Sequence, residues 1–178
     1  MAGNRKKIRF GAAWVTFGTV LGPIGEIIDC GYTIGGVNFT VETQGHEILV
    51  DQEGISPVAE SILGRKVTAT VPMAESNYER INKMLPDSTY GPDSTGYLLE
   101  VASGLGKNLM DFADVLTITS KFDANDWIKV YAAAPIANLN AAFTAQNERI
   151  WPVQFKGYVT DAGGIYAGKI FAMHEGVS

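Results

Sequence analysis

The sequence predicts a mainly β protein, an antiparallel β-sandwich or barrel with one flanking α-helix. Runs of β-branched and aromatic residues with period-two alternation recur along its 178 residues. Turn residues, among them twenty glycines and seven prolines, separate these runs. Only one segment has apolar residues at helical spacing. Short strands separated by turns favour antiparallel pairing, and the length favours a single domain over residues 1–178.

The chain starts with a basic segment and a first strand. Residues 1–9 are polar, with cations at Arg5, Lys6, Lys7 and Arg9, so we expect a flexible basic arm. Residues 10–20 are rich in aromatic and β-branched side chains and predict a strand that ends at the turn sequence GPIG, residues 22–25.

Two alternating runs follow in the first half of the chain. Residues 37–44 place Val37, Phe39 and Val41 on one face and Asn38, Thr40 and Glu42 on the other. Residues 46–52 come after Gly45, so these two runs could form a hairpin. A turn at Pro57 precedes the second alternating strand, residues 66–71, which ends at Pro72. There Val67, Ala69 and Val71 share one face, and Lys66, Thr68 and Thr70 share the other.

Residues 74–86 predict one α-helix, about three turns long. The spacing of Ser76 and Glu79 suits a capping box, and Pro86 stops the run.

The second half predicts strands again, for roughly seven to ten in all. We expect a turn-rich loop at 87–96 and then strands within 96–102, 114–122, 127–135, 150–159 and 164–173. Residues 135–149 suit either a short helix or an extended loop.

No pattern in the sequence predicts catalysis, a metal or a cofactor. His46 and His174 lack partners at ligand spacing, and no nucleophile motif or phosphate loop is present. The acids Asp51 and Glu53 could act on a substrate only in a cleft, and we expect solvated turn residues. The net charge of −5 argues against binding nucleic acid through its phosphates. One cysteine, Cys30, excludes a disulfide within the chain and is expected to be a small, partly buried residue. We therefore expect a protein that acts through shape and assembly.

Some aromatic residues exceed what one modest core requires. Trp14, Phe17, Trp151 and Tyr166 would suit a large interface between identical subunits, or simply a larger core.

The segment VDQEGISPVAESILGRKVTATVPMAESNYERINKMLP resembles the core of the tail tube proteins of long-tailed bacteriophages. In that family a strand ends in an Asp-Gln loop, and a proline turn leads into a second strand. A VP-apolar-Ala-Glu step then enters a short amphipathic helix. The matching elements are residues 50–52, Pro57, 66–71, 72–75 and 78–85, and the preceding GGVNFTVET extends the similarity over residues 35–86.

The resemblance implies hexameric rings that stack into a hollow virion tube, assembled in the host cytoplasm. DNA would pass through without specific binding, between walls expected to be anionic, and no membrane or cofactor would be involved. Partners would be identical subunits and the tape measure, terminator and distal tail proteins. The lumen would be lined by Asn38, Thr40, Glu42, Lys66, Thr68 and Thr70. We expect Lys66 to sit at a strand end and to pair with an acid of the next subunit. Contacts between rings would involve Arg5, Lys6, Lys7, Arg9, Asp51, Gln52 and Glu53.

Two other classes of function stay open on the sequence. One is a non-catalytic β-sandwich that binds carbohydrate or protein, such as a capsid decoration module. The other is an enzyme built on a β-barrel.

Overall fold

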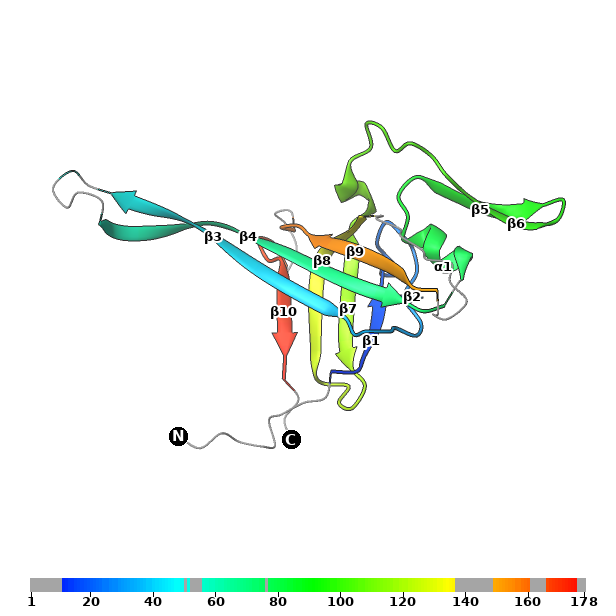
Figure 1. Ribbon diagram of the computed structural model, residues 1–178, viewed down its shortest axis with the longest axis horizontal. Coiled ribbons are helices and arrows are strands. Elements are labelled where there is room, and N and C mark those ends of the chain that lie inside the picture. Colours follow the sequence, from blue (N-terminus) through cyan, green and yellow to red (C-terminus); the bar gives the residue numbers. More distant parts are fainter. Residues whose placement is uncertain are drawn as a thin grey trace.

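The computed structural model describes residues 11–49, 51, 56–75, 77–136, 149–160 and 166–175. It is mainly β, with antiparallel sheets and a single short α-helix, which confirms the predicted fold class (Figure 1). The strands are β1 (Ala13–Phe17), β2 (Ile28–Asp29), β3 (Asn38–Leu49), β4 (Pro57–Met73), β5 (Ser88–Asp93), β6 (Gly96–Val101), β7 (Asp114–Ser120), β8 (Trp127–Ile136), β9 (Trp151–Gly157) and β10 (Phe171–His174). The helical elements are α1 (Tyr78–Lys83) and the 3₁₀ turn η3 (Leu109–Phe112).

Eight of these strands form one antiparallel sheet, in the order β2-β1-β7-β8-β9-β4-β3 with β10 also paired to β8. The start of β8 pairs with β10 and its end with β9, so the sheet branches at this strand. Strands β5 and β6 form a separate two-stranded sheet that extends away from the main body (Figure 1).

The core lies between strands from the two ends of the sheet. Phe17 of β1 and Phe155 of β9 are both buried, and their ring centroids are 4.8 Å apart. Val67, Val71 and Met73 of β4 lie in the same buried cluster. Phe17 is therefore a core residue, whereas Trp14 is partly exposed on the opposite face of β1. Strand alternation accounts for the difference, because the two residues are an odd number of positions apart.

A short segment after β2 links the two ends of the sheet. Thr33 forms an isolated antiparallel bridge with Met73. The Ala74 amide donates to the Tyr32 carbonyl at 2.8 Å, and the Ile34 amide donates to the Pro72 carbonyl at 3.1 Å. This bridge brings β1 and β2 close to the end of β4, so the sheet folds back on itself around the core.

Helix α1 is shorter than the sequence predicts and begins later. Its N-cap is Asn77, whose side-chain oxygen accepts a hydrogen bond from the Arg80 amide at 3.2 Å. The predicted cap, Ser76, lies outside the described residues. The Arg80 guanidinium donates to the Glu75 carboxylate at 2.5 Å and fixes the chain just before the helix. The predicted capping box is wrong in position because Asn is as good an N-cap as Ser.

Strand β3 runs without a break through Gly45, so the hairpin suggested by residues 37–44 and 46–52 is wrong. Residues on both sides of Gly45, from Asn38 to Leu49, pair with β4, and the register shifts between Gln44 and Gly45 because Leu63 of β4 has no partner. The extra residue of this β-bulge therefore lies in β4, and β3 stays extended through Gly45 instead of reversing. Pro57, where the sequence predicts a turn, is instead the first residue of strand β4. The missing amide hydrogen of proline is tolerated at that position.

Part of the predicted loop at 87–96 is strand β5. Ser88 through Asp93 pair with β6, and residues 94 and 95 make the turn. Turn residues such as Gly91 and Pro92 are tolerated here because both strands of a two-stranded sheet are edges.

The core packing predicts a large loss of stability for Phe155→Ala. Removing a fully buried aromatic ring that packs on Phe17 should lower the free energy of unfolding by about 3–5 kcal/mol. Urea denaturation followed by circular dichroism measures this change. Leu105→Ala is the control, because Leu105 is 92% exposed and its loss should change stability by less than about 0.5 kcal/mol. A Phe155→Ala loss below about 1 kcal/mol would contradict the packing of Phe155 against Phe17.

Cys30 is buried, and burial raises the pKa of its thiol from 9.0 to about 12, with a smaller contribution from Asp29. A folded-state pKa above the unfolded value means that this group's contribution to stability is complete below pH 9 and is lost as the pH rises toward 12. At pH 8 we expect a thiol reagent to label no cysteine in the folded protein and one after unfolding in urea. Fast labelling of the folded protein would show that the thiol is accessible.

Candidate functional site

The structure brings all six residues predicted to line a lumen onto one face of the β3–β4 ladder. Asn38 lies opposite Thr70, Thr40 opposite Thr68, and Glu42 opposite Lys66. Side chains of cross-strand partners share a face of the sheet. Asn38, Glu42 and Lys66 are exposed, and the three threonines are partly buried.

The opposite face of the same ladder belongs to the core. Val67, Ala69 and Val71 are buried, and Phe39 and Val41 pack against the core cluster. Strict alternation therefore separates an apolar inner face from a polar outer one.

Strand β9 extends the polar surface beyond the residues that the sequence indicated. Gln154 lies opposite Thr70, and Lys156 lies opposite Thr68. We call the eight residues the polar face: Asn38, Thr40, Glu42, Lys66, Thr68, Thr70, Gln154 and Lys156. Alternation within 150–159 could have indicated which side chains of β9 are polar, but only the fold shows that β9 lies beside β4.

The charges on this face differ from expectation. Lys66 lies in the middle of β4, not at a strand end, and its ammonium is 3.8 Å from the Glu42 carboxylate of the same chain. The Lys156 ammonium is 5.1 Å from the centroid of the Tyr158 ring. One glutamate and two lysines give the polar face a net charge of +1, so these strands do not present the expected anionic surface.

Beyond Glu42 and Lys66 the two strands leave the body as a long ribbon (Figure 1). We call residues 43–49 and 57–65 the outer hairpin. All of its residues are exposed except Gly64, which is partly buried. Glu47 and Glu60 are cross-strand partners, an unfavourable pair of like charges. Five exposed residues are large and apolar: Ile48, Leu49, Val58, Ile62 and Leu63.

The residues predicted to join rings are mostly beyond the described parts of the chain. Asp51 is exposed next to the end of β3. Arg5, Lys6, Lys7, Arg9, Gln52 and Glu53 lie outside the described residues, so the structure places none of them.

The described residues contain no group of three or more His, Cys, Asp or Glu side chains that could hold a metal ion. His46 is on the exposed outer hairpin opposite Ser61, and His174 stacks on Trp127 with 5.2 Å between ring centroids. The buried carboxylate of Asp114 accepts a hydrogen bond from the Thr19 hydroxyl at 2.9 Å, which ties the turn after β1 to the start of β7. The two histidines and this acid lie on different elements.

None of the helical segments in the described ranges has the length and apolar character needed to cross a lipid bilayer. The chain matches no protein-family model, and no curated protein matches it significantly.

Exchanging the charges of the Glu42–Lys66 pair tests its geometry. Lys66→Glu should lower the free energy of unfolding by up to about 1 kcal/mol, because it places two carboxylates opposite each other. Adding Glu42→Lys should restore most of that loss. Chemical denaturation of the single and double variants measures the coupling, and strictly additive losses would contradict the pair.

Proposed function

We propose that this protein is a structural subunit that assembles with identical copies into rings, and that the rings stack into a hollow tube like that of a phage tail. The observation that carries this proposal is the outer hairpin. A two-stranded ribbon in water is marginally stable by itself. This ribbon also exposes five large apolar side chains, which a neighbouring subunit could bury.

The open edge of the sheet supports the same assignment. Strand β3 is the terminal strand in the sheet order, and it is twelve residues long. A long exposed edge invites pairing with another strand, and a ring of identical copies provides one at every subunit.

The polar face suits a wall past which DNA moves. Threonine, asparagine and glutamine side chains carry no charge, and Glu42 partly neutralises Lys66. Tight binding of DNA depends on many lysine and arginine contacts to phosphates, which release counterions. A face with one net positive charge per subunit offers few contacts to phosphates and should let the genome slide without retaining it, while the subunit as a whole keeps its charge of −5.

In this proposal the protein has no catalytic role and needs no cofactor. Its partners are identical subunits and the other tail proteins, namely the tape measure, terminator and distal tail proteins, and its place is the virion.

Electron microscopy of the concentrated protein tests the assembly. We expect rings or hollow filaments from the wild type. The double substitution Ile62→Asp and Leu63→Asp should abolish them while leaving the unfolding free energy within about 0.5 kcal/mol, because both side chains are exposed in the free subunit.

Leu105→Asp is the matched control, since Leu105 is apolar and exposed but lies in a turn outside the outer hairpin. It should assemble like the wild type. Wild-type protein that stays monomeric at every concentration would reject the tube and favour a binding or capsid decoration module.

A further inference from the structure

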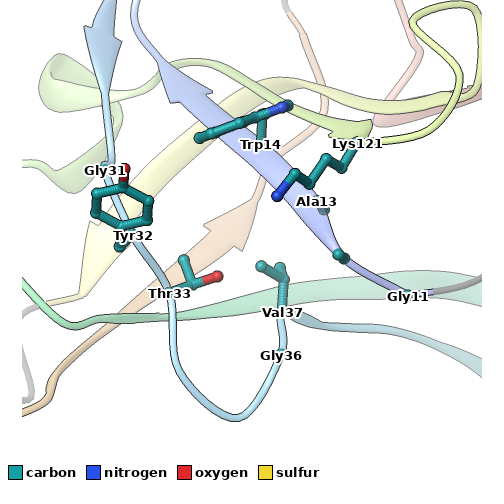
Figure 2. A pocket seen from close by; sticks show the side chains of 10 residues that line it. Gly11, Ala13, Trp14, Gly31, Tyr32, Thr33, Gly36, Val37 and Lys121 are labelled. Atoms are coloured by element: carbon teal, nitrogen blue, oxygen red, sulfur yellow. The ribbon is translucent and has the colours of Figure 1, made fainter.

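A cavity of about 380 Å³ opens between the start of β1 and the segment that follows β2. Its lining includes Trp14, Tyr32, Thr33, Val37 and Lys121. Figure 2 shows the Lys121 side chain reaching toward the space bordered by Trp14, Tyr32 and Val37. The cavity is part of neither the polar face nor the outer hairpin.

Two aromatic rings at this cavity are left open to solvent. Trp14 is 43% exposed and Tyr32 is 69% exposed. Gly36 also borders the cavity with a φ of +83°, a conformation that favours glycine, so the loop turns here without a side chain. Exposed aromatic surface beside a hollow is typical of a site that receives another aromatic or apolar group.

A cation also borders the cavity, the ammonium group of Lys121. The Lys121 ammonium lies 5.7 Å from the centroid of the Trp14 ring. Among the described residues no carboxylate lies within ion-pair distance of it. The group that best fits this site is therefore an aromatic side chain with a carboxylate nearby.

The β5–β6 hairpin of this same chain carries that combination at its tip. Tyr97 is 70% exposed and stacks on Tyr90, with 5.4 Å between ring centroids. Asp93 is the cross-strand partner of Gly96, so its side chain leaves the hairpin on the face opposite to that of Tyr97, next to the turn. Its carboxylate accepts hydrogen bonds from the Ser94 amide at 2.6 Å and from the Ser94 and Thr95 hydroxyls at 3.3 and 3.4 Å. No cation among the described residues pairs with Asp93. The β5–β6 hairpin extends away from β1, so its tip does not reach the cavity of the same subunit (Figure 1).

We propose that the tip of the β5–β6 hairpin of one subunit inserts into this cavity of the next subunit. Asp93 pairs with Lys121, and Tyr97 packs against Trp14 and Tyr32. The contact joins two different surfaces, so it is heterologous and repeats from copy to copy as a ring or a filament. The inference rests on the proposed assembly and names a second contact within it.

Cross-linking tests the contact. An introduced pair, Asp93→Cys with Lys121→Cys, is treated in assembled protein with a short bismaleimide. The Cα atoms of two residues that form an ion pair are usually too far apart for a direct disulfide between cysteines at those positions. A bismaleimide can bridge that longer distance. Cys30 should not react with the reagent, because it is buried and its thiol pKa is about 12. We expect a ladder of covalent multimers on a denaturing gel.

The matched control combines Asp93→Cys with Lys129→Cys. Lys129 also lies over a tryptophan ring, that of Trp127 at 4.8 Å, but outside the cavity. This control should give no ladder. Filaments or rings without a ladder from the Lys121 pair would overturn the hairpin contact and leave the tube intact. A wild type that forms neither rings nor filaments would overturn both proposals.

Charge exchange provides a second measurement that needs no cysteine. Asp93→Lys and Lys121→Asp should each raise the critical concentration for assembly, by up to about fivefold. The double variant should return toward the wild-type value. A double variant whose effect is the product of the two single effects would overturn the pairing of these residues.

Discussion

The pairing of β4 on both edges is the constraint on which the rest of the molecule depends. Its second half pairs with β3 on one side and β9 on the other, and its odd-numbered residues from Val67 to Met73 are all buried. A slip of one residue would move threonines into the core and valines into water. The register of β4 therefore sets the core and the polar face together.

The same strand shows where the core ends. From Val67 to Met73 every second residue of β4 is buried against other strands. From Pro57 to Lys66 nearly all residues of the strand are exposed. The body can thus fold on the buried residues alone, and the outer hairpin contributes little to them. This separation of body and outer hairpin suits a subunit whose hairpin becomes buried only when a neighbouring subunit covers it. In the free subunit we expect the outer hairpin to have low local stability.

The polar face shows why net charge is a poor guide to one surface. The chain carries a net charge of −5, yet the strands that form this face present one glutamate and two lysines. In the proposed tube, small uncharged polar side chains, rather than acidic repulsion, would keep the binding of DNA to this surface weak. The proposed roles of the outer hairpin and of the β5–β6 tip follow from the same physical rule, that apolar and charged groups left without partners in a subunit tend to find them in an assembly.

By itself, the sequence determined the fold class, most strand positions and the two faces of 37–44 and 66–71, because side-chain alternation depends only on local backbone geometry. It also indicated that Asn38, Thr40 and Glu42 would share a face, as would Lys66, Thr68 and Thr70. Only the tertiary structure decided that these sets lie opposite each other and that β9 adds Gln154 and Lys156. It also decided that β3 continues through Gly45 opposite a bulge in β4, and that Lys66 lies opposite Glu42. Those features depend on which distant strands pair, and pairing is chosen by the packing of the whole core rather than by any local pattern.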